Sequence, residues 1–289
     1  MSHPLKRHPK PAWPSYTGIS HYVGTSPSGQ VVVYVDPSLG APALQNAKDL
    51  VRDADRVVKA NNAFFGSPGG AVEVIIFALD GQTDGSGGAD HNACNYTSGG
   101  AIEVCASFGH PARVSALFEA ELSECSMGGN LCGVCTGEAL SRWCAAAVSG
   151  NALADFATAP TWAQKGMPDY VNTTDNTDQN AVSTGCGMAF LSWLQHSGST
   201  LNKIAPAMVA LGTSGTLAQL YAKLTSDAQS NAWPKFQAAI KALPQIATDD
   251  PFSGVSGAGK KAALKGAKGQ PAPSAKNPVR QKTARSSGR

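Results

Sequence analysis

Two short, almost uninterrupted apolar stretches on either side of a long amphipathic segment constrain the fold of this chain most. "QVVVYVDPS" (30–38) and "AVEVIIFALDG" (71–81) have the composition of strands, and the second is apolar enough to be central in a sheet. Between them, apolar residues recur at three- and four-residue steps through 42–66, which predicts a helix with one buried face. Strand, helix and strand in this order predict a sheet with a helix packed against it.

The stretch "CNYTSGGAIEVC" (94–105) predicts a hairpin that joins this sheet. Gly99-Gly100 lies at its centre between residues of alternating polarity, which is typical of a two-residue turn. Such a turn places Cys94 opposite Cys105, at a separation that a disulfide can span. We therefore expect a Cys94–Cys105 disulfide.

After Pro111 the pattern changes to helices. Apolar spacing and end signals predict helices over 111–127, 136–148, 183–198, 201–211, 216–225 and 232–243. The expected fold class is α+β, one domain with a mixed-sheet part (29–110) followed by a helical part (111–247). Residues 1–28 are expected to be irregular, and 248–289 to form a basic tail.

The charge of the chain is divided unevenly. Residues 260–289 contain nine Lys and Arg and no Asp or Glu, so the other residues keep 14 basic against 20 acidic groups, a net charge of −6. The tail has too few apolar residues to fold alone. It is interpreted either as a contact for nucleic acid or an anionic surface, or as a solvated segment that aids solubility.

Seven cysteines all lie between positions 94 and 186. Four are close in sequence, and they are consistent with a structural zinc site, with disulfides or with buried thiols: Cys125, Cys132, Cys135 and Cys144. The expected disulfide and the sequons "NYT" (95–97) and "NTT" (172–174) favour a secreted or envelope protein. The first residues lack the apolar core of a signal peptide, which favours the cytoplasm for the sequence as written, and the location stays open. No apolar run is long enough for a membrane span.

The segment "FEAELSE" (118–124) has glutamates where an amphipathic helix should have apolar side chains. On a helical projection that starts at Val114, Glu121 falls within the apolar stripe and Glu124 on its flank. Glu119 falls on the opposite face, where we expect it to be in solvent. A buried carboxylate needs a cation, a metal or hydrogen-bond donors, so partners are expected for the two inward glutamates.

Glu138 in "TGEALSR" adds a third carboxylate on the next helix, one turn before Arg142. These two residues are typical of a local ion pair between positions i and i+4. Arg142 could instead reach Glu121 or Glu124 in a buried structural network. A third interpretation groups Glu121, Glu124 and Glu138 around one metal centre.

The order of these elements resembles the gluzincin metallopeptidases, and most closely the plant basic secretory proteins and their bacterial relatives. The similarity covers about residues 30–243. It rests on "VEVIIFALDG", "GGAIEVCASF", "GEALSRWCA" and "LAQLYAKLTSDAQSNAWPKFQAAI", which are similar to that family's core strand, edge strand, glutamate helix and closing region. The resemblance implies a zincin-like fold.

The family's active helix carries HExxH, in which two histidines bind zinc and the glutamate is the general base. The matching residues here are Ala120-Glu121-Leu122-Ser123-Glu124. The resemblance therefore implies Glu121 as the catalytic base and Glu124 and Glu138 as metal ligands, with alanine at the first ligand position. Two histidines close in sequence could replace the lost imidazole: His91 and His110.

A centre rich in carboxylates suits calcium or manganese, whereas an added histidine favours zinc, and the pattern is also compatible with no metal. Three hypotheses follow. The first is a metallopeptidase-like protein that binds a peptide or glycan in its cleft without catalysis. The second is an active metal-dependent hydrolase, and the third is adhesion through residues 260–289. Whether the chain is an enzyme stays open.

Overall fold

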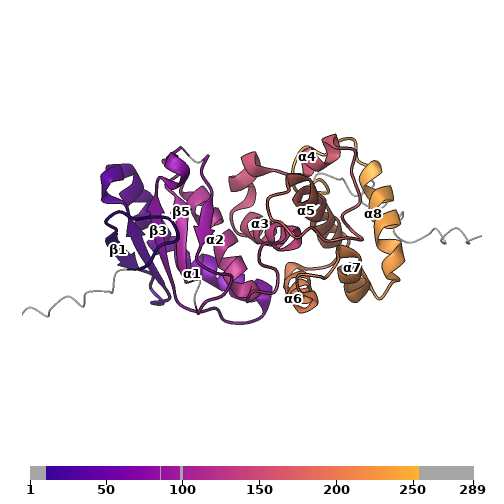
Figure 1. The fold of residues 1–289 in the computed structure, drawn as a ribbon, viewed down its shortest axis with the longest axis horizontal. Coiled ribbons are helices and arrows are strands. Elements are labelled where there is room, and N and C mark those ends of the chain that lie inside the picture. Colours follow the sequence, from indigo (N-terminus) through magenta and orange to yellow (C-terminus); the bar gives the residue numbers. More distant parts are fainter. Residues whose placement is uncertain (1–10, 85, 98–99, 254–289) are drawn as a thin grey trace, which may run out of the picture.

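The computed structural model describes residues 11–84, 86–97 and 100–253, and within them the fold is α+β. Figure 1 shows two halves side by side, a sheet with its helices and then a bundle of helices. This arrangement confirms the expected succession of a sheet part and a helical part.

The sheet has five described strands in the order β1-β2-β3-β5-β4. Their bounds are β1 His21–Thr25, β2 Val31–Val35, β3 Val72–Phe77, β4 Ala89–His91 and β5 Ala101–Cys105. The central strands β2, β3 and β5 are parallel, and β1 and β4 are antiparallel strands at the two edges. The sheet is thus mixed, as the sequence predicted.

Helix α1 (Gly40–Phe65) connects β2 to β3 and packs on the sheet. Its buried face carries Leu50, Ala54 and Val57, which the periodicity placed there. The helix ends at Gly66, whose φ of 71° is readily adopted by glycine and whose N–H donates to the carbonyl of Asn62.

Helix α2 (Pro111–Met127) lies between α1 and α3 (Cys135–Ser149), as Figure 1 shows. Because neighbours cover α2 on more than one side, its far face is not in solvent. Glu119 is 0% exposed, so the prediction that it is solvated was wrong. A helical projection assumes that only one narrow stripe of the helix is buried, whereas α2 is buried on several faces.

The helical part continues with α4 (Ala159–Gln164), α5 (Ala181–His196), α6 (Leu201–Leu211), α7 (Leu217–Thr225) and α8 (Ala232–Lys241). Its core is an aromatic cluster in which Trp162 and Phe236 stack and Phe190 meets Phe236 edge to face. The short helix α4 was not predicted. No helix among the described residues is long and apolar enough to cross a membrane.

Both expected terminal boundaries need correction. Strand β1 lies within 1–28, and the expected irregular segment is therefore partly sheet. At the other end, Asp249 Oδ1 accepts hydrogen bonds from the N–H groups of Thr158 and Ala159 at the start of α4. Phe252 is buried in the helical core, so ordered packing extends past position 248. The basic stretch 260–289 lies outside the described residues.

Candidate functional site

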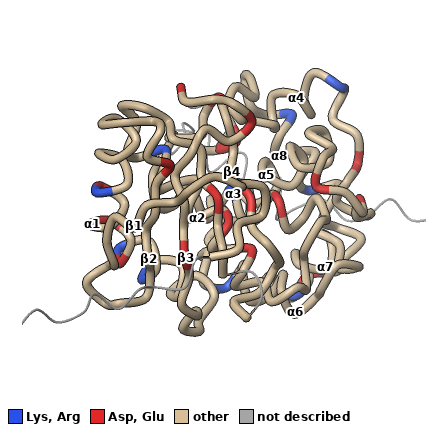
Figure 2. The backbone as a smooth tube through the Cα atoms, turned by 60° about the vertical axis from the view of Figure 1, so that its left-hand side comes forward, with Lys and Arg blue, Asp and Glu red and all other residues tan. Residues whose placement is uncertain are grey.

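A cleft of about 630 Å³ lies where the edge strand β4 and helices α2 and α3 meet the C-terminal segment. Its described lining includes one arginine, Arg142, and eight acidic residues: Asp80, Asp90, Glu121, Glu124, Glu138, Asp178, Asp249 and Asp250. Figure 2 shows acidic positions gathered around β4, α2 and α3. The cleft therefore attracts cations and repels anions.

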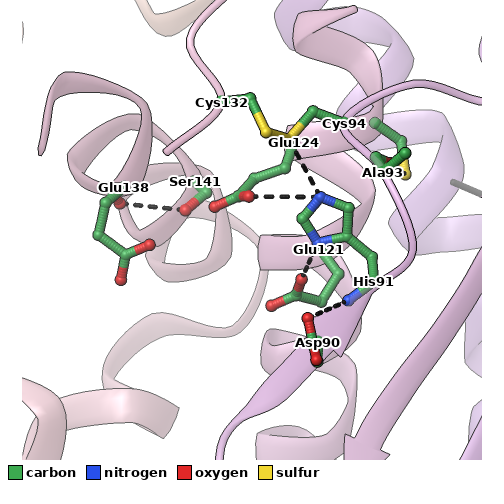
Figure 3. A network of polar contacts seen from close by, with 10 residues as sticks. Asp90, His91, Ala93, Cys94, Glu121, Glu124, Cys132, Glu138 and Ser141 are labelled. Atoms are coloured by element: carbon green, nitrogen blue, oxygen red, sulfur yellow. Dashed lines mark hydrogen bonds and ion pairs between the residues drawn. A yellow bond between two sulfur atoms is a disulfide. The ribbon is translucent and has the colours of Figure 1, made fainter. Parts of the chain in front are cut away.

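His91 lies at the centre of the acidic lining (Figure 3). Its Nδ1 atom is 2.7 Å from Glu121 Oε2, and its Nε2 atom is 3.6 Å from Glu124 Oε2. The side chains of His91, Glu121 and Glu124 are 10%, 13% and 18% exposed. Both ring nitrogens thus face carboxylates in a nearly buried position.

The backbone brings these groups together from separate elements. His91 is the last residue of β4, which packs against α2. Glu121 and Glu124 are three residues apart on α2 and therefore share a helix face. The sequence had named His91 as one of two candidate histidines, and it is the one that reaches these glutamates.

The site makes ionised carboxyl groups costly. Burial, together with the charges of Glu121 and Glu138, raises the pKa of Glu124 to about 8. Burial also raises the pKa of Glu121, although the hydrogen bond with His91 opposes the rise. Burial lowers the pKa of His91, but the hydrogen bond and charge of Glu121 outweigh it and the net pKa is raised. Positive charge is therefore favoured at this point of the cleft.

Glu138 and Arg142 form the local ion pair that their spacing predicted. Arg142 Nε is 2.5 Å from Glu138 Oε1, and the guanidinium also donates to the carbonyl of Phe156 at 2.8 Å. Glu138 still lines the cleft, with 21% of its side chain exposed. Its charge therefore adds to those of Glu121 and Glu124, while Arg142 partly offsets it.

His110 does not join this group. It directly precedes α2 and lines a different cavity of about 520 Å³, together with Arg113 and Asp155. Glu121 lies eleven positions further along the helix, about 16 Å at the rise of an α-helix.

The expected Cys94–Cys105 disulfide was wrong, because Cys94 bonds to Cys132. Strands β4 and β5 pair Ala89 with Val104. In this register the N–H group of Cys105 donates to the carbonyl of Gly88, so Cys105 lies beside Gly88 and not opposite Cys94. A longer connection replaces the two-residue turn, so the central glycines do not set the register. Gly99 itself lies outside the described residues.

The four cysteines considered as a zinc set do not form one cluster. Cys132 is in the disulfide, and Cys135 Sγ accepts a hydrogen bond from the backbone N–H of Asp175. Burial raises the pKa of Cys144, and the charge of the nearby Glu119 raises it further. Instead, donor atoms of His91, Cys94 and Glu124 lie within 4.8 Å of one another. The proximity of Cys94 to this group was not predicted, although His91 and Cys94 are only three residues apart.

Glu119 is the most deeply buried carboxyl group on α2 and faces away from the cleft. Ser123 Oγ donates to its Oε1 atom at 3.2 Å, whereas Oε2 has no hydrogen-bond partner in the described structure. Burial raises the pKa of Glu119 well above its ordinary value, and the hydrogen bond from Ser123 only partly opposes this. Ionisation of Glu119 is thus costly, and the side chain belongs to the core.

No protein-family model matches the chain, and a search of curated proteins finds no significant match. The geometry and charge of the cleft are therefore what indicate a function for the chain.

Proposed function

We propose that the chain binds a divalent metal ion at His91 and Glu124 and holds a positively charged peptide in the acidic cleft around it. The observation that carries the proposal is the orientation of the His91 ring. Nδ1 is held by Glu121 at 2.7 Å, and Nε2 faces Glu124 and the sulfur of Cys94. Metal-binding histidines usually donate their other ring nitrogen to a carboxylate in this way, which fixes the tautomer.

The donor set fits a transition metal better than calcium. One imidazole with carboxylates suits zinc or manganese, whereas calcium prefers oxygen ligands alone. His91 supplies, from strand β4, the imidazole that Ala120 cannot supply from α2. Glu124 keeps the ligand role that the gluzincin resemblance implied, and Glu121 becomes a positioning residue for His91. A bound metal would supply positive charge and polarise a carbonyl group of a ligand.

The placement of two helices supports the proposed zincin-like arrangement. An antiparallel edge strand, β4, lies against the helix that carries Glu121 and Glu124. The next helix, α3, contributes Glu138 to the same cleft. The positions of α2 and α3 are those that the resemblance gives to its active helix and glutamate helix, whereas the stretch that it likened to an edge strand contains β5, which lies inside the sheet and parallel to β3.

The charge of the cleft selects the class of ligand. Eight acidic residues against one arginine favour a peptide with Lys or Arg side chains and disfavour nucleic acid or phosphorylated ligands. Of the peptide and the glycan that the sequence left open, the peptide is therefore preferred, because a neutral glycan gains nothing from this charge.

Metal titration tests the proposal. Metal-free protein should bind one equivalent of zinc or manganese by calorimetry, and Glu124→Gln should weaken that binding at least tenfold. Asp155→Asn is the matched control, since Asp155 lies in the other cavity and should leave the affinity unchanged. Equal binding by wild type and Glu124→Gln would contradict the assignment of the site.

A peptide array tests the ligand. Basic peptides should bind with an affinity that falls with salt, and acidic peptides should not bind. If neutral oligosaccharides bound in preference to basic peptides, the proposed ligand would be a glycan and not a peptide.

Hydrolysis is a second candidate, favoured by the raised pKa of Glu121 inside the cleft. A carboxylate with a raised pKa is a better general base near neutral pH. Metal-dependent cleavage of a basic peptide that is lost in Glu121→Gln would establish it. Binding without any cleavage would leave the protein as a binding module.

A further inference from the structure

The disulfide between Cys94 and Cys132 lies directly against the centre built on His91 (Figure 3). Cys94 Sγ is 3.4 Å from His91 Nε2, and Glu124 Oε2 is 3.6 Å from the same nitrogen. Cys132 Sγ is bonded to Cys94 Sγ and therefore adjoins the same point. One imidazole, one carboxylate and the sulfur of Cys94 converge there, and the sulfur of Cys132 is one bond farther away.

From this convergence we infer that the disulfide is a redox control on the metal centre. Reduction would turn Cys94 and Cys132 into two further ligands, which complete a four-ligand zinc site with His91 and Glu124. The inference rests on the proposed metal function of His91 and Glu124. A thiolate is a strong zinc ligand and a disulfide sulfur is not, so the redox state changes the donor set.

The change in donor set is also a change in metal preference. With the disulfide formed, the centre offers an imidazole and a carboxylate, which accept manganese as well as zinc. With both thiolates added, it offers the soft donors that select zinc. Four protein ligands also close the coordination sphere, as in structural zinc sites, and leave no position for a ligand in the cleft.

The two sulfurs differ in solvent exposure, which determines the one that a reductant attacks first. Cys132 is exposed and Cys94 is buried, so a thiolate of a dithiol reductant attacks Cys132 Sγ. The bond between the two sulfurs breaks, and Cys94 leaves as a thiolate that takes up a proton. The second thiol of the reductant then resolves the mixed disulfide. The reductant becomes a disulfide, and Cys94 and Cys132 have gained two electrons and two protons, which zinc displaces on binding.

Both cysteines lie on connections between regular elements, so the sulfurs can separate. Two thiolates on a tetrahedral zinc ion are about 3.8 Å apart at the usual zinc–sulfur distance, farther than in a disulfide. Cys94 follows the end of β4, and Cys132 lies between α2 and α3. The α2–α3 connection contains three glycines with positive φ, a backbone that adjusts easily: Gly128, Gly129 and Gly133.

Cobalt titration of the full chain tests the inference, because thiolate ligands give cobalt a charge-transfer band in the near ultraviolet that nitrogen and oxygen ligands do not. Protein reduced with a phosphine should show this band at one equivalent of cobalt, and oxidised protein should not. Zinc competition should give an affinity on the order of 100-fold higher in the reduced form, since the softer donor set prefers zinc.

Variants separate these cysteines from the other thiols. Cys94→Ser should abolish the reductant-dependent band, and Cys132→Ser should give a weaker band that no longer needs reductant. Cys186→Ser is the control, because Cys186 is buried in the helical core and should leave the band unchanged. Reduced wild type needs no substitution, so the test holds even if a serine variant fails to fold.

The outcomes distinguish this inference from the proposed function. Equal cobalt binding in both redox states, without the thiolate band, would overturn the redox control and leave the His91–Glu124 site standing. A band that persists when Cys94→Ser and Cys132→Ser are combined would also overturn it, by assigning the metal to other thiols. No metal binding in either redox state would refute the proposed function as well.

Discussion

The buried carboxyl group of Glu119 makes a prediction about how the stability of the protein depends on pH. Glu119 is 0% exposed and has one hydrogen bond, from Ser123, so the folded protein keeps it protonated above its ordinary pKa of 4.5. The unfolded chain ionises it near that pKa. The folded state then binds more protons than the unfolded state, and the wild type loses stability as pH rises toward the folded pKa. The substitution Glu119→Gln removes this titration and keeps a similar shape.

The dependence of the free energy of unfolding on pH follows from the one proton that Glu119 keeps in the folded state and loses in the unfolded chain. Over the pH range in which only the unfolded chain is ionised, the free energy of unfolding of the wild type should fall by about 1.4 kcal/mol per pH unit relative to Glu119→Gln. At pH 5 the variant should be less stable by about 1 kcal/mol, because the amide adds a buried donor where Oε2 has no partner. The order of stability should therefore reverse toward the upper end of that pH range.

Urea unfolding at pH 5, 6 and 7, followed by tryptophan fluorescence and with a chelator present, measures this difference. Asp155→Asn is the control. Although burial raises the pKa of Asp155, Arg113 lowers it by more, so Asp155 is ionised in both states above pH 5 and should add no slope. Parallel pH profiles for wild type and Glu119→Gln would refute the assignment of a protonated, buried Glu119.

Three further predictions concern stability. Zinc at 100 times its dissociation constant should stabilise the wild type by about 2.7 kcal/mol, and equal stabilisation of Glu124→Gln in thermal melts would contradict this. Phe252→Ala should lower the free energy of unfolding in urea by about 3–5 kcal/mol, because Phe252 is 3% exposed. Ile19→Ala, at a residue that is 72% exposed, should lower it by less than about 0.5 kcal/mol. Gly185→Ala should cost about 1–3 kcal/mol despite the better helix propensity of alanine, since a Cβ would clash with the Thr158 carbonyl; an unchanged melting temperature would exclude that clash.

The regular elements were predictable where the local pattern and the tertiary environment agree. The predicted helix 111–127 coincides with α2, and 42–66 differs from α1 by two residues or fewer at each end. Strand β1 was missed because its residues are exposed or half-buried, so it lacks the continuous apolar run of β2. The register of β4 against β5 was also missed, since the long connection that sets it has no signature in the sequence.

The composition of the candidate site was predictable in part. The inward position of Glu121 and Glu124 follows from helical periodicity, and the Glu138–Arg142 ion pair follows from its spacing. The choice of His91 over His110 depends on which strand edge packs against α2, a long-range property that periodicity does not contain. The partner of Cys94 depends in the same way on the approach of two distant connections.

One helix thus holds three glutamates for two different physical reasons. Glu119 faces α1 and α3, where no cation is within hydrogen-bond distance among the described residues. Burying the protonated carboxyl group there costs less free energy than burying the carboxylate. Glu121 and Glu124 face a cleft whose cations are His91 and Arg142, and these balance only part of the charge of the lining. Burial raises the pKa of Glu124 as well, to about 8, so protonation relieves part of the charge in the cleft too. What distinguishes the cleft from the core position of Glu119 is therefore the convergence of several carboxyl groups on one imidazole, which is the arrangement that the proposed metal site needs.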